Sequence, residues 1–390
     1  MIKRSCCCIC KSSLTSIYTL QNVPIQLSCI DAPIYDSTSL SFSQCNQCLT
    51  IQLDHLIPLN ILYANSHNYM SIGKIWNDYF QLMCDKLLPI IKNKTVLEIG
   101  DPSAKIANRI APSYNKWYIV EPNKNNNISF ADNIEFIESF FDDSFTLEGI
   151  SVRGDEKGKE KIDVIVHSHL FEHIYEPNLF LTKCYHLLDL GGEMFFGVPN
   201  IQNIADEQLC PFLGIFFEHT VFLNKENISF LLESNGFEVI EIIDYLKHST
   251  IYHVKKIMRF GVMDLIGKKA GGVIIQNYYP SFFNTLHNYQ DFVYNTNQTI
   301  SSSNLPVYIF GASYNTQFLL ALGINVESIS GILDNSKDKQ NKYLFGYHLL
   351  IYSPEIIKDM DCIVILKNGY YVNEIKNQLL SFNNQTIILS

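Results

Sequence analysis

The sequence lacks a long apolar run, a leader-like start and a surplus of positive charge. No apolar run reaches the roughly 18 residues that a membrane-spanning helix needs. The first residues, Met1 to Cys6, do not form the apolar stretch of a secretory signal. The formal net charge of −10, with 29 basic against 39 acidic residues, disfavours nucleic acid as a partner. We therefore expect a cytoplasmic protein with reduced thiols and with neither a membrane nor a nucleic-acid partner.

Apolar residues are plentiful, so the chain is expected to form packed domains. Hydrophobic residues make up 47% of its 390 residues and charged residues only 17%, which excludes disorder as the main state. A chain of this length corresponds to about two to three domains.

Cysteine is concentrated at the N-terminus, where seven of the eleven cysteines fall within the first 48 residues. Two pairs have the Cys-x-x-Cys spacing, which lets two thiolates on one tight turn reach the same zinc ion. The predicted zinc ligands are Cys7, Cys10, Cys45 and Cys48. Four thiolates close a tetrahedral site, so a structural zinc module is predicted. The neighbouring Cys6 and Cys8 leave the register of the first pair open, and free thiols are the alternative.

Apolar segments of strand length alternate with helical segments over most of the remaining chain. The expected strands of a first series are 95–99, 117–120, 134–137, 162–167, 193–198 and 237–243, and those of a second series are 307–310, 329–333, 362–366 and 386–389. Such alternation predicts parallel sheets that helices cover on both faces. Residues 244–305 are less regular, apart from a helix expected over 279–295.

The turn after the first of these strands predicts a nucleotide-type ligand site. Gly100 ends the strand, and Glu121 follows 21 residues later at the end of the next strand. A glycine lets the backbone approach a ligand, and an acidic residue accepts hydrogen bonds from ribose hydroxyls. Because the turn has one glycine and Asp101 is a poor neighbour for pyrophosphate, S-adenosylmethionine fits better than NAD. The predicted cofactor contacts are Glu98, Gly100, Glu121 and His167.

Histidines and carboxylates occur together in two later segments. His169-x-x-Glu172-His173 has the spelling of a zinc-protease motif, but it spans a strand end and a loop instead of one helix face, which argues against a metal. The ends of parallel strands face the ligand crevice, so His173 is a candidate acid–base residue or substrate contact, with a packing role as the alternative. Glu218-His219 joins a carboxylate to an imidazole, a pair that can tune proton transfer near neutral pH. A solvated loop pair is the alternative.

The order of these parts resembles the sugar C-methyltransferase family from Cys7 to the end of the chain. Segments similar to class I methyltransferases are Asp163–His167, Leu187–Gly192 and Leu231–Phe237, and those similar to the family's closing domain are Tyr308–Ser313, Gly331–Gly346 and Ser353–Glu355. The resemblance implies an α/β fold in three parts. These are a zinc-binding module over residues 1–60, a class I, Rossmann-like methyltransferase domain over 61–245, and a C-terminal Rossmann-like substrate-binding domain over 246–390.

The resemblance also implies a reaction, the C-methylation of a nucleotide-linked keto sugar in carbohydrate biosynthesis. His219 would remove a proton beside the carbonyl, with Glu218 orienting its ring. His173 and Tyr69 would steady the enolate oxygen. Phe216 stands where the family has a tyrosine, so one hydroxyl is missing.

Two other functions stay open at this stage. The first is an O- or N-methyltransferase that acts on a nucleotide sugar or a glycan precursor, which the loss of the tyrosine at Phe216 favours. The second is a non-catalytic binding protein with a vestigial methyltransferase fold. Its support is Pro102, which stands where the family has a second glycine.

Overall fold

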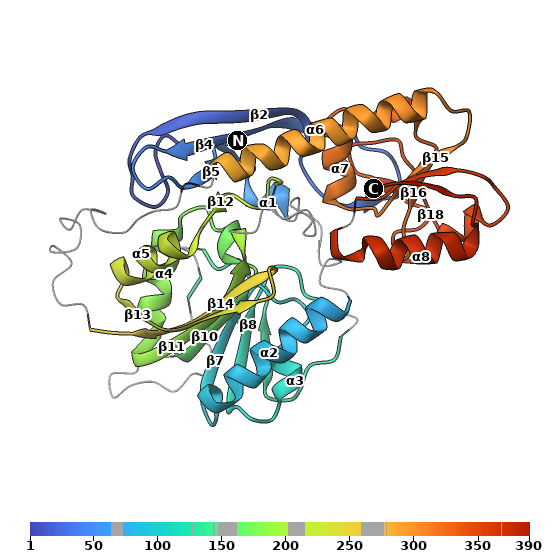
Figure 1. Cartoon of the computed structure of the whole chain (residues 1–390). Coiled ribbons are helices and arrows are strands. Elements are labelled where there is room, and N and C mark those ends of the chain that lie inside the picture. Colours follow the sequence, from blue (N-terminus) through green and yellow to red (C-terminus); the bar gives the residue numbers. More distant parts are fainter. Residues whose placement is uncertain are drawn as a thin grey trace.

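The structure is a computed structural model of the whole chain (Figure 1). It describes residues 1–63, 73–125, 128–142, 145–146, 162–201, 215–258, 277, 279–367 and 369–390. Within these ranges, no helix combines the length and the apolar character that a bilayer crossing requires.

A seven-stranded sheet forms the centre of the molecule. Its strands, in spatial order, are β13 (Phe237–Tyr245), β14 (Ser249–Lys256), β11 (Leu188–Pro199), β10 (Ile162–Ser168), β7 (Thr95–Ile99), β8 (Lys116–Val120) and β9 (Ile134–Ile137). All neighbouring strands from β11 to β9 pair in parallel, whereas β14 runs antiparallel to both β11 and β13. This order, with one reversed strand next to the edge, is that of the expected class I methyltransferase sheet.

The strand β14 lies in the stretch for which the sequence predicted no regular alternation. It pairs with β11 along Glu193–Pro199 and with β13 through a tight hairpin in which Leu246 has a φ of 53°. The central sheet therefore continues to Lys256, eleven residues past the expected boundary at 245.

Side chains that alternate along the parallel strands bury two apolar faces. Val96, Val164 and Val166 pack against the helices α2 (Lys74–Ile91) and α3 (Ala107–Ile110). Leu97 and Ile165 point the other way, toward α4 (Pro177–Leu187) and α5 (Lys225–Ser234). A sheet covered on both faces leaves the carboxyl ends of its strands as the open edge, where ligands bind in folds of this kind.

The N-terminal module is a four-stranded antiparallel sheet. Its order is β12 (Val221–Phe222), β5 (Ile51–Leu53), β4 (Ser37–Cys45) and β2 (Leu14–Pro24). The edge strand β12 comes from the segment that follows Glu218-His219, so this sheet holds that segment in place. Shorter elements nearby are β1 (Ile2–Lys3), β6 (His55–Leu56) and α1 (Leu59–Leu62).

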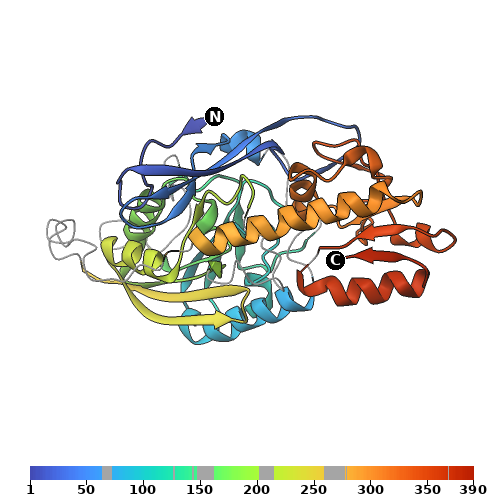
Figure 2. The same ribbon diagram turned by 45° about the horizontal axis from the view of Figure 1, so that its top comes forward.

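The C-terminal part contains a second, five-stranded parallel sheet. Its order is β18 (Ile351–Tyr352), β16 (Gly331–Leu333), β15 (Val307–Phe310), β19 (Ile363–Ile365) and β20 (Ile387–Leu389), with α7 (Tyr314–Ala321) and α8 (Val372–Phe382) beside it. Helix α6 (Tyr279–Ser301) runs from the N-terminal sheet to this domain (Figures 1 and 2).

One apolar cluster joins the N-terminal module to the C-terminal domain. It includes Leu40 and Phe42 of β4, Phe282 of α6, and Ile309 and Ile365 of the five-stranded sheet. The short strands β17 (Tyr343–Leu344) and β3 (Cys29–Ile30) also pair across the two parts. The two terminal parts thus share one core, and together they lie over one side of the central sheet (Figure 1).

Candidate functional site

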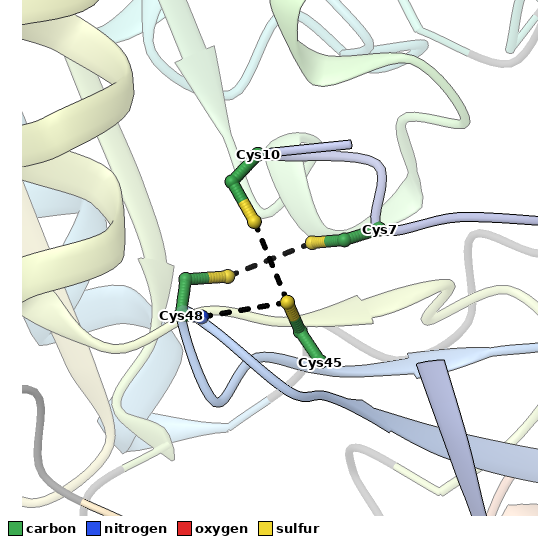
Figure 3. Close-up of side chains that lie close together, drawn as sticks. All are labelled: Cys7, Cys10, Cys45 and Cys48. Atoms are coloured by element: carbon green, nitrogen blue, oxygen red, sulfur yellow. Dashed lines mark hydrogen bonds between the residues drawn. The ribbon is translucent and has the colours of Figure 1, made fainter. Parts of the chain in front are cut away.

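The four predicted cysteines meet at one point. Sγ of Cys7 lies 3.5 Å from Sγ of Cys48, and Sγ of Cys10 lies 3.4 Å from Sγ of Cys45 (Figure 3). All four sulfur atoms lie within 4.8 Å of one another. Four thiolates at about 2.3 Å from one tetrahedral zinc would be about 3.8 Å apart, so the donor set suits such an ion. Cys6 and Cys8 lie outside this group, which fixes the register that the sequence left open.

The two cysteine turns are bound to the central domain. The side chain of Asn178 on α4 donates to the carbonyls of Cys8 and Ile9, at 3.2 and 3.0 Å. Asn227 on α5 donates to the carbonyl of Cys48 at 3.3 Å. The cluster therefore ties the N-terminal module to the two helices on one face of the central sheet.

The turn after β7 has the features expected of a cofactor site without phosphate. Gly100 has a φ of +85°, and a Cβ there would lie 3.1 Å from Leu170. Asp101 accepts the backbone N–H groups of Ser103 and Lys105 at 2.8 and 2.5 Å. Because a carboxylate already holds these N–H groups, they are not free to bind a pyrophosphate. Pro102 is accommodated in this turn.

The two acidic residues predicted as cofactor contacts have different surroundings. Glu98 is buried, and its Oε2 accepts a hydrogen bond from Nε1 of Trp117 at 2.8 Å. Burial raises the pKa of Glu98 well above its ordinary value, and nearby Asp101 adds to this effect. Glu121 directly follows β8 and is partly exposed, and its Oε1 accepts the backbone N–H of Asn123. Glu121 is therefore the more accessible of the two side chains.

His167, a predicted cofactor contact, lies in an aromatic cluster. Its ring is fully buried and stacks on Phe196 at 4.6 Å, with Phe171 and Phe180 at 6.1 and 5.5 Å. Neither ring nitrogen has a hydrogen-bond partner among the described residues, and burial lowers the pKa of His167 to about 3. A neutral imidazole in such surroundings packs as an apolar side chain, and the cofactor contact stays a prediction.

A second buried cluster forms after the end of β10, and three imidazoles in it surround one carboxylate oxygen. Oε1 of Glu172 lies 3.5 Å from Nδ1 of His169, 3.8 Å from Nε2 of His173 and 3.8 Å from Nε2 of His219. Among the described residues, neither oxygen of Glu172 has a hydrogen-bond partner. One potential ligand atom from each of Glu172, His173 and His219 lies within 4.8 Å of the other two, close enough to share an ion.

Glu218 extends this cluster toward the C-terminal domain. Its Oε2 lies 3.8 Å from Nδ1 of His173, and its Oε1 accepts a 2.8 Å hydrogen bond from the hydroxyl of Tyr314. The same Nδ1 of His173 lies 3.1 Å from the hydroxyl of Tyr63. Glu172 is thus a carboxyl group next to His219 in addition to Glu218, which the sequence predicted for this place.

Backbone and side-chain bonds hold these segments together. The backbone N–H of Thr220 donates to the carbonyl of Glu172 at 2.9 Å, and the hydroxyl of Thr220 donates to the carbonyl of Ile174 at 3.1 Å. The buried guanidinium of Arg4 donates to the carbonyls of Thr220 and Tyr175, both at 2.6 Å. The N-terminal module therefore fixes the relative position of the two histidine segments.

Burial sets the protonation of the cluster. It raises the pKa of Glu172 to about 7, against an opposing effect of His173. Burial lowers the pKa of His219 well below its ordinary value, and the nearby His173 and His169 lower it further. Burial also lowers the pKa of His169 to about 3. His219 is therefore neutral at neutral pH, in the form that accepts a proton, beside a carboxyl that ionises near neutral pH.

One predicted site residue lies outside the described part of the chain, and three residues of the cluster had no predicted role. Tyr69 lies outside the described residues. Tyr63, Glu172 and Tyr314 belong to the cluster, although the sequence analysis gave them no role. Glu172 could have been found from its place in His169-x-x-Glu172-His173, whereas nothing local in the sequence marks Tyr63 or Tyr314.

Comparisons with known families match both large parts of the chain. A family model described as a methyltransferase domain matches residues 75–242. A model described as the C-methyltransferase C-terminal domain matches residues 262–387. The first covers most of the seven-stranded sheet, and the second covers α6 and most of the five-stranded sheet.

Two curated relatives match shorter stretches. A probable S-adenosylmethionine-dependent methyltransferase of Mycolicibacterium smegmatis is 33% identical over 81 residues, which cover 20% of this chain and 29% of that protein. The human mitochondrial ubiquinone biosynthesis O-methyltransferase is 30% identical over 104 residues, which cover 23% and 27%. The chain thus spans less than a third of the length of these relatives.

Solved structures of methyltransferases are also similar to about half of the chain. The N-methyltransferase NodS of Bradyrhizobium japonicum, in complex with S-adenosyl-L-homocysteine, has 13% identity and a TM-score of 0.35, covering 50% of this chain and 93% of that one. A SAM-dependent methyltransferase of Aquifex aeolicus has 12% identity and a TM-score of 0.33, covering 46% and 98%.

Proposed function

We propose that the chain is a methyltransferase that methylates a carbon of a nucleotide-linked keto sugar. The matches to a methyltransferase domain and to a C-methyltransferase C-terminal domain support this proposal. The observation that carries this proposal is the buried cluster of Glu172, His173, Glu218 and His219, which has a neutral base beside a carboxyl group. C-methylation needs such a base because a proton must leave the carbon next to the carbonyl.

His219 is the proposed base. With its Nε2 proton directed at Glu172, 3.8 Å away, its Nδ1 lone pair accepts the proton from the substrate carbon. The electron pair of the broken C–H bond moves to the carbonyl oxygen and gives an enolate. The ionised Glu172 then stabilises the imidazolium that forms. In this scheme Glu218 orients His173, whose Nδ1 lies 3.8 Å from its Oε2, and Glu172 serves His219.

His173 and Tyr63 are the proposed groups for the enolate oxygen. Nδ1 of His173 and the hydroxyl of Tyr63 lie 3.1 Å apart, and both are in a buried region where hydrogen bonds to a developing charge are strong. Tyr63 takes part of the role that the resemblance gave to Tyr69. A ketone oxygen bound here would lie on the side of the cluster opposite to Glu172.

S-adenosylmethionine is the proposed methyl donor; when bound, it supplies the electrophilic methyl group that the enolate carbon attacks. The turn around Gly100 would hold it, because Asp101 fills the N–H groups that a phosphate would need. Glu121 would accept hydrogen bonds from its ribose hydroxyls. The bound ribose and the histidine cluster would both lie at the carboxyl ends of β7, β8 and β10.

The cysteine cluster is proposed to hold one structural zinc ion. Backbone N–H groups donate to sulfur, from Ile9 to Cys7 and from Gln47 and Cys48 to Cys45, each at 3.4 Å. Such bonds stabilise thiolates in the form that binds zinc. With four protein ligands the site is closed, so its role is in folding and not in catalysis.

O- or N-methylation of a nucleotide sugar or a glycan precursor is the second candidate, because His219 could equally deprotonate a hydroxyl or an ammonium. Solvent deuterium separates the two. The protein is incubated in deuterated buffer with a nucleotide-linked keto sugar, with and without S-adenosylmethionine. C-methylation predicts deuterium at the carbon next to the carbonyl without the methyl donor, and none with His219→Ala. Methyl transfer without any such exchange would overturn the carbanion mechanism and favour O- or N-methylation.

A further inference from the structure

One residue of the C-terminal domain reaches into the histidine cluster. Tyr314 is the first residue of α7 and is buried, with 7% of its surface exposed. Its hydroxyl donates the 2.8 Å hydrogen bond to Oε1 of Glu218, across 96 positions of sequence. The cluster otherwise consists of residues from the central domain and of Tyr63, so Tyr314 is the contact through which the C-terminal domain takes part in it.

The ring of Tyr314 also belongs to a stack that ends at His219. It lies 3.8 Å from the ring of Phe216, with only 12° between the two planes. Phe216 in turn packs on the ring of His219 at 4.3 Å. A single tyrosine is thus linked to Glu218 through its hydroxyl and to His219 through a shared aromatic neighbour.

The position of Tyr314 is fixed by bonds around the start of α7. The N–H of Ala312 donates to Oδ2 of Asp334 at 2.8 Å, which anchors the preceding turn to the end of β16. On the next helical turn, Gln317 donates to the carbonyls of Gln26 and Phe345, at 2.9 and 3.0 Å. The N-terminal module and the C-terminal domain therefore both hold this helix, and the tyrosine cannot move independently of them.

We propose that Tyr314 is a positioning residue, and that it supplies from the C-terminal domain the hydroxyl that is missing on the ring of Phe216. It fixes one oxygen of Glu218 so that the other faces His173. Because this hydrogen bond goes to a buried carboxyl group, loss of the hydroxyl would weaken the hold on Glu218 Oε1 and let the side chain move. The hydrogen bond from Tyr314 to Glu218 therefore helps to orient His173, which binds the enolate oxygen in the proposed reaction.

The same residues line a small cavity. Phe216, Glu218 and Tyr314 belong to its lining, together with Leu27 and Gln317. The contact between Tyr314 and Glu218 therefore lies where the N-terminal module, the central domain and the C-terminal domain meet.

The test compares Tyr314→Phe with the double variant Phe216→Tyr/Tyr314→Phe, which moves the hydroxyl to the other ring of the stack. Removal of one hydrogen bond to a charged group is expected to lower kcat for methyl transfer by about 10- to 100-fold. KM for S-adenosylmethionine and the melting temperature should change little, because the ring stays. The double variant should recover most of the lost kcat. Tyr347→Phe is the matched control, since its hydroxyl bonds to the carbonyl of Gln317 away from Glu218.

This inference rests on the proposed reaction, so a second measurement addresses the contact without turnover. Nitrogen-15 NMR of histidine side chains should show a changed titration of His173 in Tyr314→Phe and its return in the double variant. An unchanged kcat together with an unchanged His173 titration would overturn the proposal, as would a loss of kcat that the second hydroxyl does not restore. A changed and restored titration in a protein that transfers no methyl group would support the contact and refute the reaction.

Discussion

The cysteine cluster and the histidine cluster are both buried groups of potential ligands, yet they are assembled in opposite ways. The cysteines come from two tight turns, and each turn contributes a complete pair. The second cluster takes Glu172 and His173 from one segment, Glu218 and His219 from another, and Tyr63 and Tyr314 from two more. The first needs two loops to meet, and the second needs all three parts of the chain in place.

The two clusters also differ in what they do for the folded state. Four thiolates around a metal gain a large binding free energy that the unfolded chain cannot reach. By contrast, both carboxylate oxygens of Glu172 are buried with no hydrogen-bond partner in the described part of the chain, which costs stability. We therefore expect the cysteine cluster to stabilise the fold, and the histidine cluster to lower the stability while it provides the proposed chemistry.

The largest effect is expected from loss of the metal site. Cys45→Ser, or removal of zinc by a strong chelator, should abolish binding that contributes about 10 kcal/mol or more, comparable to the whole stability of a domain. Because the N-terminal sheet, Arg4 and the Thr220 segment depend on this module, loss of activity should follow unfolding. Zinc per chain, measured by mass spectrometry, and the melting temperature check this. Cys6→Ser is the control, and a zinc-free protein with an unchanged melting temperature would refute a structural role.

The next largest effect is expected at His219. His219→Ala should lower kcat by about 100- to 10,000-fold, the usual contribution of a general base. The melting temperature and S-adenosylmethionine binding by calorimetry should be close to those of the unaltered protein, since the residue touches neither the zinc cluster nor the Gly100 turn in the described structure. His287→Ala, on the exposed side of α6, is the control. Full activity in His219→Ala would remove this residue from the mechanism.

The pH dependence separates chemistry from stability at Glu172. Burial raises its pKa to about 7 from an ordinary 4.5, so the folded protein holds this proton more tightly than the unfolded chain. The resulting stabilisation is complete below about pH 4.5 and is lost as the pH rises through about 7. Activity should change in the opposite sense and rise through about pH 7, because only the ionised carboxylate stabilises the imidazolium of His219.

Glu172→Gln should remove both inflections. We expect its kcat above pH 7.5 to fall by about 10- to 100-fold, equivalent to about 1.4–2.8 kcal/mol of lost transition-state stabilisation. Denaturant unfolding and initial rates, each measured from pH 5 to 9, give the two profiles. Glu176→Gln, whose carboxylate forms an exposed ion pair with Lys11, is the control. A rate inflection near pH 7 that persists in Glu172→Gln would assign it to another group.

The sequence predicted features that lie within short segments, and it missed contacts that only the fold brings together. The Cys-x-x-Cys pairs, the strands β7, β8 and β10, and the Gly100 turn are encoded in short segments, so their patterns predicted them. Strand β14 was missed because an antiparallel strand after a tight hairpin breaks the helix–strand alternation. The nearness of Glu172 to His219 was not predicted, because only the fold brings the two segments together and sequence adjacency drew attention to Glu218. Tyr314 has no local signal at all.

The smallest effect on kcat is expected at Arg4, the residue that links the two clusters. Its guanidinium donates to the carbonyls of Thr220 and Tyr175, between the cysteine turns and the histidine segments. Arg4→Met keeps most of the side-chain volume but removes these bonds, each worth about 1.5–3 kcal/mol when the donor is charged. We expect a lower melting temperature and a kcat lowered only a few-fold, with zinc fully retained. Lys3→Met, on the exposed strand β1, is the control. If Arg4→Met loses zinc together with activity, the two clusters form a single cooperative unit, and the separation between a stabilising and a catalytic cluster does not hold.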